Sequence, residues 1–196
     1  RCALSKKEWD AADGIFHSGG EDEGGGRWQF KKDFEPRWQM QWGNVRFFVA
    51  PTPFRHVGVF PEQASQWEWI SQKISNAKRP VKVLNLFGYT GIASLVAASA
   101  GAEITHVDAS KKIIAWAREN QKLSKLEDYP VRWIIDDALK FVKREVRRKA
   151  AYDGFIIDPP KFGRGPKNEI WKIYKDLPML LNECQKLFSD NLLFLN

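Results

Sequence analysis

The sequence is poor in cysteine and has no long apolar run, and these two shortages exclude two classes of protein. Cys2 and Cys184 are the two cysteines among 196 residues, too few for the disulfide framework of a small secreted domain, so a reducing cytoplasm is expected. No run reaches the roughly 20 apolar residues that span a bilayer, and we expect no membrane partner. No charged-then-apolar leader opens the chain. Because it begins with Arg1 instead of Met, we expect a fragment of a longer protein.

The composition that is present favours a folded domain with an affinity for polyanions. Hydrophobic residues make up 43% of the chain, enough for a packed core, and the length favours one main domain. The net charge of +7 raises the encounter rate with nucleic acid and allows counterions to be released on binding. This balance favours RNA or DNA as a partner without identifying one.

Three segments are expected along the chain. Residues 1–37 are rich in glycine around His17–Gly26 and are predicted to be a flexible segment without regular structure. Residues 38–79 are predicted to form a β-hairpin followed by a helix. Residues 80–196 are predicted to form the ligand-binding domain.

In that domain, apolar strands alternate with helices. The strands are apolar throughout, which is typical of parallel strands buried on both faces. The sequence therefore predicts an α/β fold with a doubly wound, Rossmann-like sheet, in which ligands bind at the carboxyl ends of the strands. Over the whole chain, including the hairpin and helix of residues 38–79, the predicted strands are 38–42, 45–49, 81–87, 104–108, 131–135, 152–158 and 192–195. The predicted helices are 62–77, 91–100, 111–123, 139–149 and 169–187.

A glycine turn, Asn85–Gly91, follows the first strand of this domain. Gly88 and Gly91 let the backbone bend tightly and approach a ligand, and the N-terminus of the following helix favours an anionic group. Thr90 and Ala93 occupy the positions of the second and third glycines of a dinucleotide fingerprint. The loop therefore suits a nucleoside with a carboxylate better than a pyrophosphate, the alternative being a plain turn that caps a helix.

Acidic residues follow the next two predicted strands. Asp108 lies 20 residues after Gly88, where a carboxylate can accept both hydroxyls of a ribose. Asp136 and Asp137, followed by Ala138, are placed to receive the exocyclic amine of an adenine. The alternative for each acid is to cap the helix that follows, and we expect one of Asp136 and Asp137 to do only that.

The sequence Asp158-Pro-Pro-Lys-Phe162 follows the fourth strand and is the most specific of these features. Two prolines fix an extended backbone and remove two donors, so their carbonyls can only accept hydrogen bonds. Together with Asp158 they form an acceptor cluster suited to the amine or ring N–H of a nucleobase. Phe162 offers a face on which an extruded base can stack, worth roughly 1–3 kcal/mol.

These features together resemble the class I S-adenosylmethionine-dependent methyltransferases. More narrowly, Asp-Pro-Pro-Lys-Phe with the Asp-Asp pair is similar to the bacterial large-subunit rRNA methyltransferases that make 5-methylcytosine or 7-methylguanine. Phe54-Arg-His-Val-Gly-Val-Phe-Pro-Glu-Gln63 resembles the segment before the methyltransferase core in that family, especially in its uncharacterised proteobacterial members. The resemblance covers nearly all of Trp38 to Asn196. It implies S-adenosylmethionine as the cofactor, RNA as the substrate and no metal.

The chain departs from that family in three respects. The catalytic cysteine of the cytosine-5 members follows the fifth strand, but this sequence ends at Asn196. Cys184 lies in an apolar helix pattern and is expected to be a core residue, and Cys2 lies in the glycine-rich start, so no nucleophile for cytosine-5 chemistry is visible. The last two strands of the usual sheet and the family's N-terminal RNA-binding domain are also not evident.

The resemblance implies a role for each motif residue. We expect Asp158 and the Pro159 carbonyl to orient the acceptor, and Phe162 to act with them. Lys161, Phe162 and Arg164 are expected to bind substrate. The basic helix from Lys140 to Lys149 is expected to be mainly a solvated face. The residues expected to hold the cofactor are Asn85, Phe87, Gly88, Tyr89, Thr90, Gly91, Asp108, Ala109, Asp136, Asp137 and Ala138, with Phe60 and Gln63 closing over its methionine end.

Two functions from other classes remain open. The first is a methyltransferase that acts on a protein or a small molecule, for which a neutral, enclosed acceptor pocket would be the discriminating observation. The second is a non-catalytic RNA-binding module, which failure to bind S-adenosylmethionine would support. A dehydrogenase is disfavoured because the second and third glycines of the fingerprint are missing.

Overall fold

The computed structural model describes residues 5–19, 25–31 and 34–196. The chain forms two compact units. The first comprises Arg1–Met40 with Phe48–Phe60, and the second comprises Gln41–Phe47 with Pro61–Asn196. None of the helices in the described ranges has the length and apolar character that a membrane span requires.

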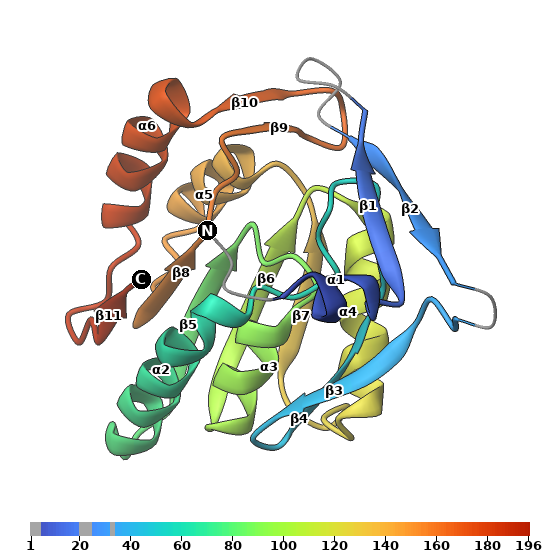
Figure 1. The fold of residues 1–196 in the computed structure, drawn as a ribbon. Coiled ribbons are helices and arrows are strands. Elements are labelled where there is room, and N and C mark those ends of the chain that lie inside the picture. The colour runs from blue at the N-terminus through green and yellow to red at the C-terminus, as the bar shows by residue number, and fades with distance from the viewer. Residues whose placement is uncertain (1–4, 20–24, 32–33) are drawn as a thin grey trace. The chain divides into compact units, whose positions relative to one another are not determined.

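The first unit contains regular structure where the sequence predicts none. A short helix, α1 (Lys6–Asp10), precedes an antiparallel pair, β1 (Gly14–Ser18) and β2 (Gly26–Phe30) (Figure 1). The prediction of no strand before residue 38 is wrong. Trp28 and Phe30 lie at alternate positions of β2, Phe16 of β1 is opposite Trp28, and the three rings pack together. Of the predicted glycine-rich loop between His17 and Gly26, residues 20–24 lie outside the described residues.

The predicted hairpin after residue 37 is confirmed. Strand β3 (Trp38–Trp42) pairs with β4 (Val45–Val49). The two-residue turn between them contains Gly43 with φ of 53°, the left-handed conformation that hairpin turns require. In the second unit, the backbone N–H of Arg46 donates to Ser124 Oγ, and this hydroxyl donates to the Arg46 carbonyl.

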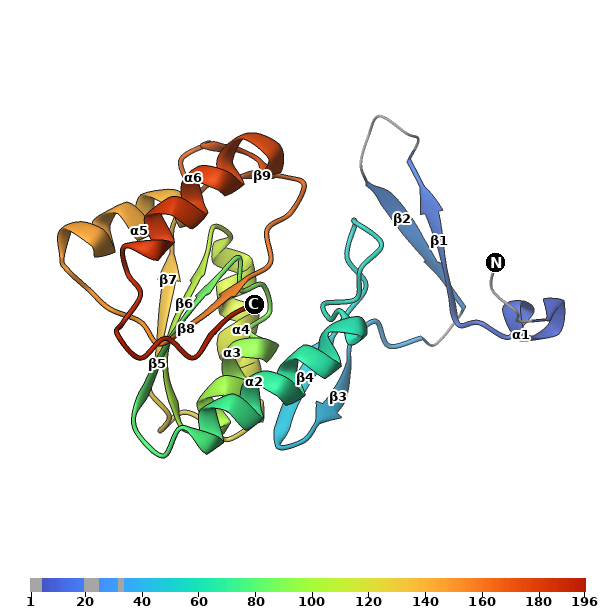
Figure 2. The same ribbon diagram turned by 90° about the vertical axis from the view of Figure 1, so that its left-hand side faces the viewer.

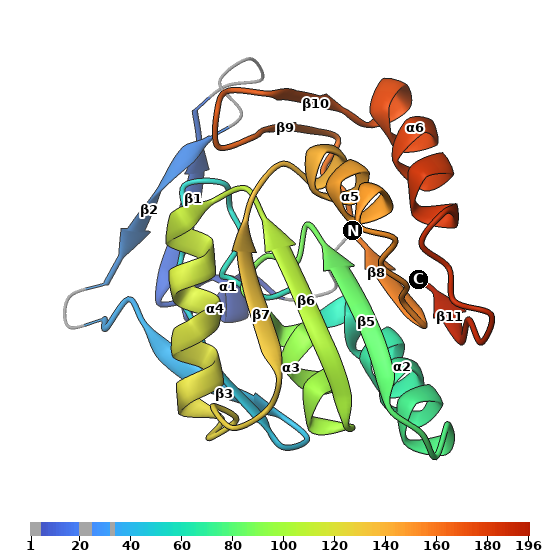
Figure 3. The ribbon, with the colours of Figure 1, turned by 180° about the vertical axis from the view of Figure 1, so that it is seen from behind.

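The second unit is built on a five-stranded parallel sheet with the order β11-β8-β5-β6-β7, which Figure 3 shows from behind. The predicted α/β fold is therefore confirmed. Because the strands are parallel, their carboxyl ends meet at one edge of the sheet. The strands are β5 (Val81–Leu86), β6 (Ala102–Asp108), β7 (Val131–Ile135), β8 (Gly154–Ile157) and β11 (Phe194–Leu195).

Helices cover both faces of this sheet, with α5 and α6 on one side and α2, α3 and α4 on the other (Figure 2). Trp67, Ile70 and Ile74 of α2 are buried, as predicted. A 3-10 turn, η1 (Pro61–Gln63), precedes that helix. The helices are α2 (Ala64–Asn76), α3 (Ile92–Ser99), α4 (Lys111–Leu123), α5 (Ala138–Arg147) and α6 (Ile173–Gln185).

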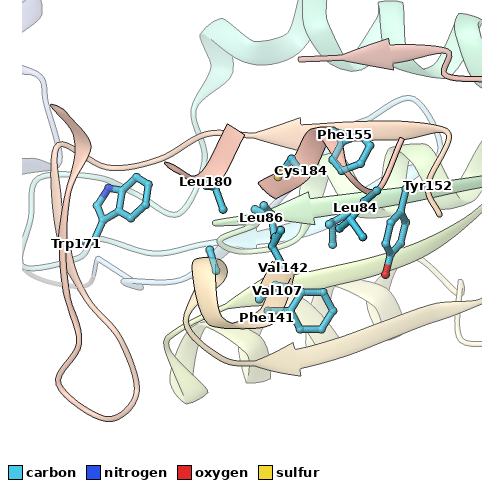
Figure 4. Packing of buried hydrophobic residues seen from close by; sticks show 12 residues of the cluster. Leu84, Leu86, Val107, Phe141, Val142, Tyr152, Phe155, Trp171, Leu180 and Cys184 are labelled. Carbon is cyan, nitrogen blue, oxygen red and sulfur yellow. The ribbon is translucent and has the colours of Figure 1, made fainter. Parts of the chain in front are cut away.

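One hydrophobic core lies on each face of the sheet. The core under α5 and α6 contains Leu84, Phe141, Phe155 and Cys184, all fully buried (Figure 4). Cys184 is thus a core residue, as expected. The opposite core joins α2 and α3 to β5, β6 and β8 through residues such as Ile70 and Val83. Burial on both faces explains the continuous apolar strands.

The segment after β8 differs from the prediction. The sequence predicts one helix over 169–187. The structure instead has an antiparallel hairpin of β9 (Phe162–Arg164) and β10 (Ile170–Lys172), and α6 begins only at Ile173. The turn that joins the two strands contains Asn168 with φ of 63°. Ile170, Trp171 and Lys172 are exposed, buried and exposed in turn, which is the alternation of a strand.

Candidate functional site

The loop after β5 is bonded to the carboxyl end of β6. The Gly88 N–H donates to the Val107 carbonyl over 3.1 Å, and the Tyr89 N–H donates to Asp108 Oδ2 over 3.1 Å. Phe87 and Tyr89 have φ values of 57° and 51°. Such left-handed conformations cost roughly 1–3 kcal/mol each outside glycine and gather at functional sites. The geometry of this loop is therefore imposed by its surroundings.

The two glycines of this loop are needed for packing within the protein. A Cβ on Gly88 would lie 2.3 Å from Cε1 of His106. Gly91 has φ of 82°, and a Cβ there would lie 2.9 Å from the Cβ of Ala117. The sequence pattern favours the approach of a ligand as the reason for these glycines, but the structure shows that they let the loop lie directly on neighbouring side chains.

Three buried polar side chains next to this loop are linked by hydrogen bonds. Asn85 Nδ2 donates to Ser94 Oγ over 2.8 Å, and Ser94 Oγ lies 2.9 Å from His106 Nδ1. Burial lowers the pKa of His106 to about 3, so its imidazole is neutral near pH 7. Asn85 is a predicted cofactor residue, yet its side chain is buried and directed to Ser94. The sequence pattern does not reveal Asn85, Ser94 and His106 as a connected group, because the three residues are separated along the sequence.

Asp108 lies at the end of β6 and is bonded through both carboxylate oxygens. Oδ2 accepts from Tyr89 N–H, and Oδ1 accepts from Ser110 N–H over 2.9 Å. Burial raises the pKa of Asp108. The cap of α4 is Ser110, whose Oγ accepts from Ile113 N–H. The alternative that Asp108 only caps this helix is therefore not what the structure shows.

The end of β7 lies beside the end of β6, because the Asp136 N–H donates to the Asp108 carbonyl over 3.1 Å. Asp137 caps α5, its Oδ1 accepting from Lys140 N–H over 2.9 Å, as expected for one of the two acids. Asp136 pairs with Arg144 and also accepts from Asp137 N–H. The first three strand ends are thus joined by direct hydrogen bonds.

The segment after β8 is held by two side chains from other elements. Gln63 Nε2 donates to Asp158 Oδ2 over 2.5 Å. Trp171 Nε1 donates to the Pro160 carbonyl over 2.8 Å, and the ring of Trp171 contacts that of Phe87 with centroids 4.8 Å apart. The Trp171 contacts connect this segment to the loop after β5. The sequence pattern does not identify Trp171, because it predicts a helix over this stretch.

The remaining predicted site residues differ in exposure. Thr90 and Ala138 are buried, whereas Lys161, Phe162 and Arg164 are exposed. Pro159 and Ala109 are partly buried.

Phe60 belongs to the first unit, where its ring lies 4.8 Å from that of His56.

Some of the basic residues between Lys140 and Lys149 are paired within the protein, while Lys143 and Arg147 are exposed. Lys140 pairs with Glu169, Arg144 with Asp136, and Arg148 with Glu145 over 2.8 Å. The exposed residues agree with the expectation of a mainly solvated face, whereas the three ion pairs tie part of this stretch to the rest of the protein.

Residues 22–190 match the model of the S-adenosylmethionine-dependent methyltransferase family. The chain belongs to this family. A crystal structure of an S-adenosylmethionine-dependent methyltransferase from Agrobacterium tumefaciens is 51% identical, with a TM-score of 0.93, and the match covers 98% of this chain and 61% of that one. The resemblance to class I methyltransferases and the expected cofactor are confirmed.

Curated relatives of this methyltransferase include ribosomal RNA large subunit methyltransferases K/L. The protein from Hahella chejuensis is 36% identical over 74% of this chain and 19% of its own length. The protein from Shewanella sp. strain ANA-3 is 35% identical over 75% of this chain and 20% of its own length. The chain therefore spans about a fifth of the length of these relatives.

The residues at the strand ends fit S-adenosylmethionine chemically. A carboxylate has about four lone-pair positions, so Asp108 can accept ribose hydroxyls in addition to its two backbone bonds. Gly91 opens α3 in the left-handed conformation, with no side-chain hydrogen bond to cap it. The N–H groups of the first turn are therefore suited to a carboxylate.

Proposed function

We propose that this methyltransferase transfers a methyl group from S-adenosylmethionine to a base of RNA, most specifically ribosomal RNA. The observation that carries the proposal is the arrangement after β8, where Gln63 holds Asp158 and the ring of Phe162 is 54% exposed beside it in the chain. This combination offers hydrogen-bond acceptors and a stacking surface to an extruded base. The named activity of the K/L relatives supports the same substrate class, and such a substrate agrees with the expected cytoplasmic setting.

The loop after β5 and the ends of β6 and β7 are proposed to hold the cofactor. Asp108 accepts the ribose hydroxyls, while the backbone of Phe87–Gly91 and the start of α3 hold the carboxylate. Asp137 caps α5 through Oδ1 and offers Oδ2 to the adenine amine, with the Ala138 backbone beside it. Gln63 is proposed to contact the methionine end of the cofactor. When bound, S-adenosylmethionine supplies a methyl group that its sulfonium already activates.

The residues after β8 are proposed to orient the acceptor. Asp158 and the Pro159 carbonyl accept hydrogen bonds from the base, and Phe162 stacks on it. Lys161 and Arg164 pair with neighbouring phosphates. Holding the acceptor in line with the methyl group lowers the barrier because translational and rotational freedom is lost on binding, before the reaction.

Methylation at carbon 5 of a cytosine would need a thiolate from outside the described core. Cys184 is fully buried, and burial raises its pKa to about 12, so its thiol stays protonated and enclosed. Cys2 lies outside the described residues. Any cytosine-5 reaction would therefore use a cysteine other than Cys184.

Methyl transfer to RNA can be tested with methyl-tritiated S-adenosylmethionine and two RNA preparations. Total RNA from cells that lack the gene should accept label, whereas wild-type RNA, already modified, should accept little. Digestion of the labelled RNA to nucleosides then identifies the methylated base. The Asp158→Asn variant should bind the cofactor normally and transfer about 100-fold more slowly, because a misplaced acceptor loses roughly that factor.

The same assay separates the alternatives. Cofactor binding without label in either RNA would refute RNA as the substrate and direct the search to proteins and small molecules. Failure to bind S-adenosylmethionine would instead support the non-catalytic RNA-binding module.

A further inference from the structure

The two strands β9 and β10 present an ordered pattern of side chains on one face. In their register, Phe162 is opposite Lys172 and Arg164 is opposite Ile170. Cross-strand partners lie on the same face, with Cα atoms about 4.5–5.5 Å apart. All four side chains are exposed, and Phe162 and Ile170 are 54% and 59% exposed. An apolar residue and a cation therefore alternate in both directions across this face.

The opposite face of the hairpin is turned into the protein. Gly163 and Trp171 are the cross-strand pair on that face. Trp171 is 5% exposed and belongs to the core under α5 and α6. The burial of Trp171 on one face of the hairpin therefore leaves Phe162 and Ile170 exposed on the other face.

The two acids at this hairpin, Glu169 and Asp176, bind groups of the protein itself. Glu169 Oε1 pairs with Lys140 of α5, and its Oε2 accepts from Lys167 N–H over 2.8 Å. Asp176 is buried, and its Oδ2 accepts from Lys172 N–H over 2.7 Å. The bond from Lys140 holds the pKa of Glu169 down, at about 2. The hairpin is therefore preorganised, and its acids are engaged in these contacts.

The segment 161–176 contains five cationic residues and two acids, so its exposed side is positive. Tyr174, two residues after Lys172, is 88% exposed and adds another ring near this segment. Exposed rings interleaved with cations are what single-stranded nucleic acid requires, since bases stack while phosphates pair with the neighbouring charges. In a duplex the base faces are hidden.

We propose that the outward face of β9–β10, formed by Phe162, Arg164, Ile170 and Lys172, is a binding platform for single-stranded RNA. Bases pack on Phe162 and Ile170, and phosphates pair with Arg164 and Lys172. This inference rests on the proposed function, which places the acceptor base next to the same hairpin. It adds Ile170 and Lys172 as residues that hold the RNA strand beyond the base that is methylated.

The test measures RNA affinity directly, by fluorescence anisotropy of a labelled single-stranded RNA of about 16 nucleotides and of its duplex. Phe162→Ala should weaken single-strand binding roughly 5- to 150-fold, the range for loss of one aromatic stacking contact. Ile170→Ser should weaken it less. The double variant Arg164→Ala with Lys172→Ala should lower the slope of log affinity against log salt by about 1.4. The duplex should bind more weakly than the single strand.

Matched controls come from other exposed positions of the second unit. Leu192→Ser removes an exposed apolar side chain before β11, and Lys122→Ala removes an exposed cation of α4. Both should leave RNA affinity unchanged. Circular dichroism and the Kd for S-adenosylmethionine should be unchanged in Ile170→Ser and Lys172→Ala, which shows that these variants fold.

Affinities equal to wild type in all platform variants, or tighter binding of the duplex, would overturn the inference. Self-association abolished by Ile170→Ser with unchanged RNA affinity would assign the face to a second copy instead. RNA binding by the platform without methyl transfer would refute only the proposed function. Methyl transfer with an unchanged KM for RNA in Ile170→Ser would refute only the platform.

Discussion

The loop after β5 and the hairpin after β8 lie at the same edge of the sheet but are built in opposite ways. The first packs its glycines onto His106 and Ala117 and bonds its backbone to Val107 and Asp108. The second buries Trp171 and exposes both a ring and cations. In the loop after β5, a single added methyl group at Gly88 or Gly91 would clash with a neighbouring side chain. On the exposed face of the hairpin, side chains can be replaced without such a clash.

This difference matches the different demands of the two proposed ligands, the cofactor and an RNA strand. A cofactor that must be held in one geometry needs a loop whose conformation its surroundings impose. An RNA strand is recognised through stacking and charge, which tolerate variation in sequence. We therefore expect substitutions after β5 to alter stability and cofactor affinity together, and substitutions on β9–β10 to alter RNA binding alone.

The largest expected effect is a dependence of stability on pH that comes from His106. Burial lowers its pKa from 6.5 to about 3, so between these values the unfolded chain binds a proton that the folded chain does not. Stability should therefore fall as pH falls through this window, by about 1.4 kcal/mol per pH unit and roughly 4–5 kcal/mol in all.

Urea unfolding across pH 7 to 3 measures this dependence. The free energy of unfolding of the His106→Gln variant should depend less steeply on pH. The difference between the two pH dependences gives the contribution of His106 alone, because the acids contribute equally to both proteins. Among these acids is Asp108, whose raised pKa changes stability in the opposite direction. Parallel slopes for both proteins would show that His106 titrates normally and that the loop is less enclosed than described.

Asp108→Asn is expected to weaken S-adenosylmethionine binding about 10- to 150-fold, since a hydrogen bond to a charged group is worth roughly 1.5–3 kcal/mol. Isothermal titration calorimetry measures the affinity. Because burial raises the pKa of Asp108, wild-type affinity should begin to fall at a higher pH than for an exposed aspartate as the solution is acidified. The variant should show no such fall; a matching decline would point to another group.

A comparison of two glycines tests the packing argument. A Cβ on Gly88 would lie 2.3 Å from His106, whereas one on Gly163 would meet Pro160 at 3.4 Å. Gly88→Ala should cost about 1–3 kcal/mol of stability through overpacking and weaken cofactor binding. Gly163→Ala should change neither property by much. Equal thermal unfolding midpoints for the two variants would contradict the difference proposed between the regions.

The smallest expected effect concerns the ion pair between Glu169 of the hairpin segment and Lys140 of α5. Glu169→Gln removes the charge that pairs with Lys140 but leaves Trp171 in the core. The melting temperature should hardly change, because an exposed ion pair contributes little. Hydrogen exchange at the amides of Gly165 and Lys167 should become faster while exchange in β5 stays the same. Unchanged exchange in both regions would mean that Trp171 alone holds the hairpin.

Much of the second unit was predictable because its strands are buried on both faces. Continuous apolar runs predict β5, β6 and β7 closely, and the predicted α4 has the observed ends. The hairpin β9–β10 was not predicted, since its strands have three residues each, too few for a period to be seen. The strands of the first unit were obscured by the glycines around them.

The sequence by itself determined the α/β class, the cofactor family and which acids follow which strands, because apolar runs and strand-end motifs are local patterns. Only the tertiary structure decided what each residue contacts. It showed that Gly88 makes room for His106, that Asp137 and not Asp136 caps α5, and that Gln63 holds Asp158 across 95 positions of sequence. Such contacts depend on how distant segments meet in the folded chain, and spacing along the sequence does not encode that directly.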